Sequence, residues 1–547
     1  MPRKGKCFST CRKRPKSDCS TPECHYTNGN KYKYCRLAFT RKMDPPDCVP
    51  ELKIPVAKNK RKTEKSRSPD SIAYNPDDHP ENSLSLKPYY PLDLRPSASD
   101  LEAFRAKYAR KVATRKIAKF LRRTNPRIRS KFLKSVCSDS GVCIAFGKES
   151  AAIKRHFANF ANFRLLSEPA KGIGVVSANG FVKELTYMNQ GYVANAVLKS
   201  SADRNSDNLL YEALVGFFVN KLALRFPTFV ETYGLYRYKN DGLAYRECKT
   251  NKIVSANVLE AGLTKYAGDS KDIENPQVFQ SCFDPVSMAV LIQHLKSAKT
   301  LKEMCGGNPK FVRNDLLYVL FQIYMTLAHT SNIFTHYDLH TSNVLVYEPV
   351  AGSHIEYYYH IDGEVITFNS PYIAKIIDYG RSYYRELGND SMVGNSKNFY
   401  EQLLCKECKP KCGASSGFGW LENNKRTIKS SFYIVSQISN PSHDLRLLNS
   451  LNVDTIRKQV PKLGDILKKV VYSVGVAKKN RVYGTELNPH SGLPHTINNV
   501  MDAFILLQEL VQDPISYADN AREYATSSKL GELHIYQKQP MLFIPAP

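Results

Sequence analysis

The stretch "THYDLHTSNVLVYEPV", residues 335–350, sets an aspartate five residues ahead of an asparagine and directly before a run of branched apolar residues. The apolar run predicts a strand, so Asp338 and Asn343 would lie on the loop that leads into it. A carboxylate can orient a hydroxyl group, and carboxylate and amide oxygens are ligands that Mg²⁺ accepts. The loop is therefore a candidate reaction centre.

Two further acids and a lysine extend this pattern. In "YIAKIIDYG", Asp378 ends an apolar strand, and Gly380 permits a sharp exit. In "VANAVLK", Lys199 is the one charge that closes an apolar strand, and Glu212 follows it by 13 residues in an apolar helix. A buried charge is costly unless it is paired, so we expect a Lys199–Glu212 ion pair. Phosphoryl transfer needs such a cation on the nucleotide phosphates, together with metal ligands and a residue that orients the nucleophile.

The stretch "VVSANGFV" precedes these motifs and predicts a hairpin turn. Its backbone could cover phosphate groups, and Gly180 would allow the chain to approach them closely. A glycine in an ordinary hairpin is the alternative interpretation, because this turn contains few glycines.

The motifs together resemble those of protein kinases over about residues 170–520. "HYDLHTSN" resembles the catalytic loop His-Arg-Asp-x-x-x-x-Asn, "DYG" resembles Asp-Phe-Gly, and "AVLK" resembles the strand motif Val-Ala-Ile-Lys. The resemblance implies an α+β, bilobal, protein-kinase-like fold with a small antiparallel-sheet N-lobe and a larger, mostly helical C-lobe. More narrowly, the chain resembles serine/threonine-protein kinases of large DNA viruses (iridovirus-type). There a cysteine adaptor module, like "CSTPECHYTNGNKYKYCR" here, precedes the kinase domain.

The resemblance also implies roles for individual residues, in an ATP- and Mg²⁺-dependent transfer of phosphate to Ser/Thr hydroxyls of protein substrates. Asp338 would orient the acceptor hydroxyl and accept its proton, and Asn343 and Asp378 would bind Mg²⁺. Lys199 would contact the α- and β-phosphates, and Glu212 would position it. The ATP-binding set implied in this way is Val175, Ser177, Gly180, Val182, Lys199, Glu212, Gln293 and Leu295. "LIQHL" (Leu291–Leu295) would be the adenine-facing hinge, and Asp444 the buried aspartate that braces the catalytic loop.

Several features depart from the family pattern. His340 stands where protein serine/threonine kinases usually carry a lysine, and it could approach the γ-phosphate or face solvent. Tyr337 replaces the arginine that senses activation-loop phosphorylation, and no Ala-Pro-Glu follows "DYG". Asn343 and Asp378 are 35 residues apart, more than is usual, so "PVAGSHIEYYYHIDGEVITFNS" would form a longer hairpin. Two alternatives stay open: a kinase-fold phosphotransferase acting on a small molecule, and a non-catalytic scaffold that binds nucleotide and nucleic acid.

The first third of the chain is strongly basic. The formal net charge is +27, and residues 1–68 hold 19 Lys and Arg against 6 acids. Residues 101–135 hold 13 Lys and Arg against one acid. This charge favours acidic partners such as nucleic acid. The longest apolar run, residues 316–328, is too short to span a membrane. With no secretory signal at the N-terminus, we expect a soluble intracellular protein, in host cytoplasm or virion if it is viral.

Cysteines cluster in two places. Six of the 14 lie in the first 48 residues, and Cys405, Cys408 and Cys412 form a second group. In a reducing compartment they could hold Zn²⁺ or stay as thiols, since neither group matches a paired zinc signature. We predict a basic, Cys-rich, adaptor-like module over 1–50, a disordered linker over 51–98 and a basic amphipathic helical segment over 99–135. The N-lobe would cover 136–295, with a polar surface insertion at 239–285, and the C-lobe 296–547.

Overall fold

The computed structural model describes the backbone of these ranges: residues 24–28, 33–37, 147–177, 180–201, 208–240, 244–273, 287–391, 393–402, 434–472 and 485–546. The predicted linker 51–98, the basic segment 99–135 and the cysteine group at 405–412 lie outside the described residues. The chain divides into two compact units, Met1–His79 and Pro80–Pro547. In the first unit, β1 (Cys24–Asn28) and β2 (Lys33–Leu37) pair as an antiparallel hairpin.

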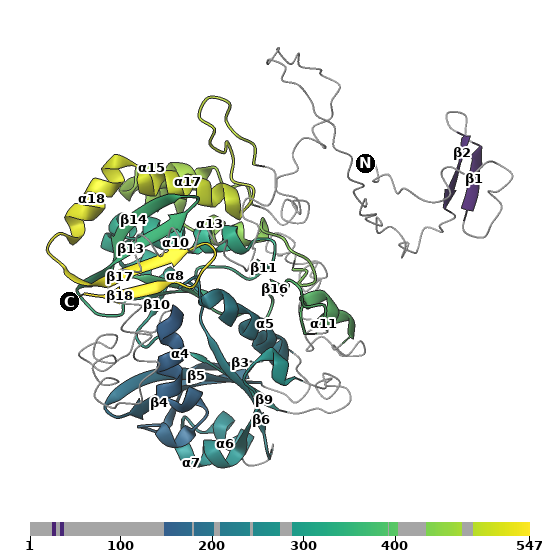
Figure 1. The fold of residues 1–547 in the computed structure, drawn as a ribbon, viewed down its shortest axis with the longest axis vertical. Helices are drawn as coiled ribbons and strands as arrows, with labels where there is room; N and C mark the ends of the chain where they lie inside the picture. Colours follow the sequence, from purple (N-terminus) through teal and green to yellow (C-terminus); the bar gives the residue numbers. More distant parts are fainter. Residues whose placement is uncertain are drawn as a thin grey trace, which may run out of the picture. The chain divides into compact units, whose positions relative to one another are not determined.

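A seven-stranded antiparallel sheet forms the first part of the second unit (Figure 1). Its strands, in the order β7-β3-β4-β5-β9-β6-β8, are β3 (Ala170–Ser177), β4 (Gly180–Asn189), β5 (Tyr192–Ser201), β6 (Thr232–Tyr238), β7 (Ile253–Val254), β8 (Leu263–Ala267) and β9 (Met288–Gln293). Gln190 and Gly191, with φ of 51° and 82°, join β4 to β5. Two residues with positive φ match the twist of the flanking antiparallel strands.

Helix α5 (Asn208–Ala223) is apolar nearly all round and is buried against this sheet. Gly216 lies against Thr232 of β6, where an added Cβ would be 2.0 Å from the threonine Oγ1. Only glycine therefore permits this approach of helix and strand. Helix α4 (Gly147–His156) and the short 3₁₀ turns η3 (Ala158–Phe160) and η4 (Phe163–Leu165) contribute to a second apolar cluster that contains Phe157, Phe160 and Phe163.

The segment 239–285 is not simply a surface insertion, and the prediction is corrected here. Its described residues form α6 (Ala244–Thr250), β7, α7 (Ala256–Gly262), β8 and η5 (Ser270–Asp272). β8 extends the sheet by pairing with β6, and Cys248 and Leu259 are fully buried. The few apolar residues of this polar stretch are spaced so that they face the core, which a reading of its average polarity misses.

The second part of the unit is built on helix α10 (Leu316–Thr330), every residue of which is buried. The structure also describes α8 (Leu301–Gly307), α9 (Pro309–Asn314), α11 (Ser396–Gln402), α13 (Arg446–Asn449), α14 (Val453–Gln459), α15 (Pro461–Lys468), α17 (Val500–Gln512) and α18 (Pro514–Tyr524). α10 packs against α17. Within the part of the chain that the structure describes, no helix is both long enough and apolar enough to cross a membrane.

A four-stranded sheet, in the order β14-β13-β17-β18, lies beside α10 and α17 (Figure 1). Phe321 of α10 contacts Tyr359 and Phe368 of this sheet, and β14 lies against α17. β13 (Ser353–Ile361) and β14 (Glu364–Ser370) form the predicted longer hairpin. β17 (Ser528–Tyr536) pairs in parallel with β13, and β18 (Leu542–Pro545) follows it. These two strands depart from the mostly helical C-lobe expected over 296–547. β17 pairs with β13, about 175 residues earlier in the sequence, and β18 pairs with β17, so the burial of both strands depends on tertiary contacts.

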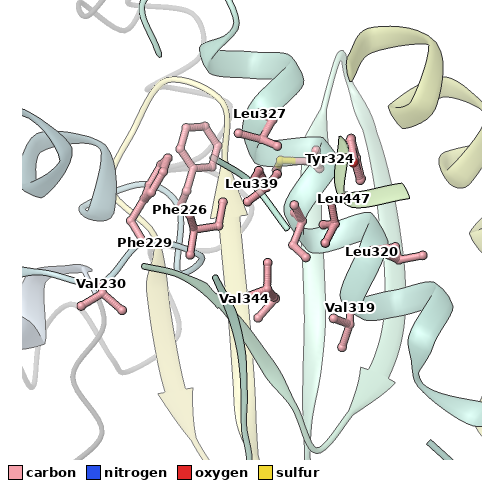
Figure 2. Close-up of a cluster of buried hydrophobic side chains, with 14 of the residues drawn as sticks. Phe226, Phe229, Val230, Val319, Leu320, Tyr324, Leu327, Leu339, Val344 and Leu447 are labelled. Atoms are coloured by element: carbon pink, nitrogen blue, oxygen red, sulfur yellow. The ribbon is translucent and has the colours of Figure 1, made fainter. Parts of the chain in front are cut away.

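Short strands frame the loop that carries Asp338 and Asn343. β11 (Phe334–Thr335) precedes it and pairs with β16 (Tyr383–Tyr384). β12 (Val344–Tyr347) follows it and lies between β10 (Lys299–Thr300) and β15 (Ile373–Ile376). Figure 2 shows Leu339 and Val344 among the side chains of α10, and both are fully buried. These two buried apolar side chains fix the position of the loop against α10.

Candidate active site

The loop between β11 and β12 holds Asp338 and Asn343 together. The side-chain amide nitrogen of Asn343 donates a hydrogen bond of 2.9 Å to the backbone carbonyl of Asp338. Asn343 is buried, whereas the side chain of Asp338 keeps 21% of its surface exposed. The loop therefore presents a reachable carboxylate beside an amide of fixed orientation.

Asp444 braces this loop from the opposite side. It lies in the 3₁₀ turn η8 (His443–Leu445), and its carboxylate accepts hydrogen bonds from the backbone N–H groups of His336 (2.8 Å) and Tyr337 (2.9 Å). The hydroxyl of Tyr324, on α10, donates to the carbonyl of Asp444. Burial raises the pKa of Asp444 to about 7, although the two backbone donors act in the other direction. Tyr337 has a φ of 63°, so the hydrogen bonds to Asp444 stabilise an unusual backbone conformation.

His336 joins the loop to the strand that ends before Asp378. Its Nε2 donates to the carbonyl of Ile377 at 2.9 Å, and its Nδ1 accepts from the backbone N–H of Asp338. Burial lowers the pKa of His336, which agrees with a neutral ring that has one donor and one acceptor. The backbone N–H of Ile377 in turn donates to the carbonyl of Asn343. Asp378 therefore lies next to the loop.

Lys199 lies between two carboxylates. Its ammonium is 2.6 Å from Glu212 Oε2 and 3.0 Å from Asp378 Oδ1. Burial opposes the charge of Lys199, but Asp378 and Glu212 outweigh it and hold the lysine pKa above its ordinary value. Lys199 lowers the pKa of Asp378, whereas burial raises that of Glu212. The structure thus forms the Lys199–Glu212 pair expected from the sequence and adds Asp378 to it.

The face of the sheet around Lys199 carries the next predicted residues. Val182 on β4 lies opposite Lys199, which lies opposite Val290 on β9, and residues paired in this way project to the same face. Gly180 starts β4 with a φ of 149° and pairs with Ser177. The structure describes Val175 and Ser177 by their backbone positions on β3.

The predicted hinge, Leu291–Leu295, covers the end of β9 and the two residues after it. The backbone N–H of Gln293 donates to the carbonyl of Glu231, and that of His294 donates to the carbonyl of Asn195. Leu295 is buried in the main core. The segment is thus tied on both sides to neighbouring strands, at the point where the chain leaves the sheet for α8.

Two arginines beside Asp338 were not predicted from the sequence. Arg446, the first residue of α13, places Nη1 2.5 Å from Asp338 Oδ1. Arg381, directly after "DYG", places Nε 3.8 Å from Asp338 Oδ2. Their positions close to Asp378 and Asp444 in the sequence are the only signal for them, and no local spacing rule connects either residue to Asp338.

The residues around Asp338 also fit the oxygen ligands that Mg²⁺ takes. Because the amide nitrogen of Asn343 is bonded to Asp338, its amide oxygen points the other way and can accept a cation. No group of three or more His, Cys, Asp or Glu residues suited to a metal occurs among the described residues. The carboxylate of Asp378 and the amide of Asn343 are nevertheless sufficient for Mg²⁺ when substrate phosphates supply further oxygens.

Comparison with known proteins gives little further information. No model of a known protein family matches the chain, and no curated protein matches it. Among solved structures, one described as "WaaP in complex with acyl carrier protein" matches 43% of this chain and 70% of its own, with 11% sequence identity and a TM-score of 0.21. So small a similarity shows neither a shared fold nor a shared activity, and the site's chemistry is taken from its own geometry.

Proposed function

We propose that this chain is an ATP-dependent phosphotransferase of kinase-like, bilobal fold, and that it transfers the γ-phosphate of ATP to Ser/Thr hydroxyls of proteins. One observation carries the proposal: Lys199 is bonded to both Glu212 and Asp378, and Asp378 lies beside the loop that holds Asp338 and Asn343. A cation, a metal-binding acid and an exposed carboxylate are the groups that phosphoryl transfer requires.

Each residue has a defined part in the reaction. Lys199 binds the α- and β-phosphates, and Glu212 holds its ammonium in place. Asp338 accepts a hydrogen bond from the acceptor hydroxyl and directs its oxygen at the γ-phosphorus. As the new oxygen–phosphorus bond forms, the bond from the γ-phosphorus to the β–γ bridging oxygen breaks. ADP leaves with that electron pair, and the hydroxyl proton passes to Asp338.

Asn343 and Asp378 would hold Mg²⁺, which supplies charge neutralisation on the phosphates when it is bound. The backbone of Val175, Ser177 and Gly180 would cover the phosphates, since these residues belong to the β3–β4 hairpin next to Lys199. The remaining nucleotide contacts would come from Val182, on the Lys199 face of the sheet, and from Gln293 and Leu295 at the end of β9.

His340 favours a second candidate, a kinase-fold phosphotransferase that acts on a small molecule. A histidine two residues after the loop aspartate also occurs in small-molecule phosphotransferases of the aminoglycoside kind, by the same resemblance. The two candidates share every step of the chemistry and differ only in the acceptor. An acceptor screen therefore separates them.

The test is transfer of labelled γ-phosphate from ATP with Mg²⁺, using the full chain and generic basic and acidic proteins. We expect label on Ser or Thr with the wild-type chain and at least a 100-fold loss with Asp338→Asn, as is usual when a group acting on the reacting atoms is removed. Asp454→Asn is the matched control, because Asp454 is exposed on α14. Binding of ATP without label on any protein, including the chain itself, would contradict the protein-kinase proposal. Label on small-molecule acceptors alone would favour the second candidate.

A further inference from the structure

The loop lacks the lysine that protein kinases usually place two residues after the catalytic aspartate. His340 occupies that position, and its Nε2 lies 4.0 Å from Asp338 Oδ1. Its Nδ1 accepts a hydrogen bond from the backbone N–H of Ser342, and burial lowers its pKa. Burial thus disfavours the charged form of the ring, whereas a lysine at this position would carry a full positive charge.

Two guanidinium groups lie at the same carboxylate, one near each oxygen. Arg446 is hydrogen-bonded to Asp338 Oδ1, and Arg381 lies near Oδ2. Their side chains are 14% and 23% exposed, so both are partly removed from water. A charge acts more strongly in such surroundings than on an open surface.

Both arginines are also fixed at the backbone. Arg446 follows directly after η8, whose Asp444 holds the loop. The carbonyl of Arg381 accepts a hydrogen bond of 2.7 Å from Ser436 Oγ. Because their backbones are fixed, the two guanidinium groups lie beside Asp338 without a change of fold. Donors that are already in place stabilise a developing charge most effectively.

We propose that Arg446 and Arg381 bind the γ-phosphoryl group during its transfer and take the place of the missing lysine. This inference rests on the proposed function. A guanidinium has five N–H donors in one plane, so a single arginine can bond Asp338 and phosphate oxygens at the same time. The hydroxyl held by Asp338 lies about 3 Å from the phosphorus in a reactive complex, so a side chain in contact with Asp338 is within reach of the phosphate oxygens.

No additional reactant is needed for this role. The oxygen–phosphorus bond forms and the β–γ bridge breaks as described above, and the proton goes to Asp338. The arginines bind the three oxygens of the group in transfer and exchange no electrons or protons. Arg446 is expected to contribute more, because it is the closer of the two to Asp338.

The experiment measures binding of ATP and of ADP, each with Mg²⁺, by calorimetry on the full chain. Arg446→Met, Arg446→Lys and Arg381→Met are compared with wild type, and Arg457→Met serves as control because Arg457 pairs with Asp465 on an exposed surface. We expect the wild-type chain to prefer ATP over ADP. Arg446→Met should reduce this preference about 10-fold and kcat by about 100-fold or more, Arg446→Lys should restore part of both, and Arg457→Met should change neither.

An unchanged preference for ATP in both Met variants would overturn the inference, even if kcat falls, because Arg446 would then only position Asp338. Thermal unfolding of each variant shows whether the fold is intact, and Arg381→Met tests the inference independently if Arg446→Met is unstable. Failure of the proposed function can be distinguished from failure of this inference. A wild-type chain that prefers ATP through these arginines but labels no acceptor supports the phosphate contact and contradicts phosphotransfer.

Discussion

Lys199 and Asp378 lie 3.0 Å apart, although 179 residues separate them in the sequence. The contact joins β5 of the seven-stranded sheet to the residues that follow β15, beside the loop of Asp338. Glu212 binds the same ammonium at 2.6 Å, so one lysine neutralises two acids. The geometry of the site therefore depends on this one side chain.

Replacing Lys199 by Met should abolish phosphotransfer and lower the free energy of unfolding by about 3 kcal/mol. Glu212 is buried, and Lys199 is the one cation bonded to it among the described residues, so removing Lys199 leaves a buried charge without compensation. The double variant Lys199→Met/Glu212→Gln should recover part of the stability and none of the transfer. Urea unfolding measures the first quantity and labelled ATP the second. Equal stability of the wild-type chain and the single variant would show that the pair contributes nothing to folding.

The antiparallel sheet was expected from the resemblance to protein kinases, and the Lys199–Glu212 pair was predicted from local patterns. Apolar strands end in a charge at Lys199 and Asp378, and α5 is apolar throughout, so each element has one plausible neighbour. Strands β17 and β18 escaped prediction because the burial of Leu533 and Ile535 depends on the distant strand β13. The contacts of Arg446 and Arg381 with Asp338 escaped for the same reason, since tertiary structure alone creates them.

Asp444→Asn should disorder the loop and reduce phosphotransfer. Each oxygen of the Asp444 carboxylate accepts one N–H, that of His336 or that of Tyr337. Asparagine replaces one of these oxygens by an NH₂ group, so one N–H then faces a donor and loses its acceptor. An unsatisfied buried donor costs about 1–3 kcal/mol. Urea unfolding and amide hydrogen exchange at His336 and Tyr337 check the result. Asp502→Asn is the control, because the Asp502 carboxylate also accepts a backbone N–H bond, from Asn498, but lies on α17. Exchange that stays slow in Asp444→Asn would refute the bracing role.

Gly216→Ala should destabilise the sheet part of the molecule by several kcal/mol, since the new methyl group would overlap the side chain of Thr232. Gly306→Ala is the matched control. Gly306 lies in α8 with nothing within 4 Å of an added Cβ, and alanine is the better helix former there. Differential scanning calorimetry should show a lower melting temperature for the first variant and an equal or higher one for the second. Similar melting temperatures for both variants would mean that α5 can shift away from β6 at little cost.

The stability of the protein should fall in mild acid because of His329. This residue is buried in α10, and its Nδ1 lies 2.6 Å from the carbonyl of Met325, to which it donates. Its Nε2 then accepts from the side-chain amide of Gln537, near the C-terminal strands. Burial lowers the pKa of His329 to about 4, with Asp362 opposing this shift and Arg225 adding to it.

A folded-state pKa below the ordinary value of about 6.5 means that the unfolded chain binds the proton more readily. The stabilisation from neutral His329 is therefore complete above about pH 6.5 and is lost as the pH falls toward 4, with a total loss of about 3 kcal/mol. Urea unfolding of the wild-type chain and of His329→Gln at several pH values in this window measures the difference. We expect the wild-type advantage to shrink as the pH falls, since glutamine does not titrate. A difference that stays constant with pH would show that His329 keeps its ordinary pKa in the folded protein. The folded protein could achieve this if the adjacent amide of Gln537 turned its oxygen toward a protonated Nε2.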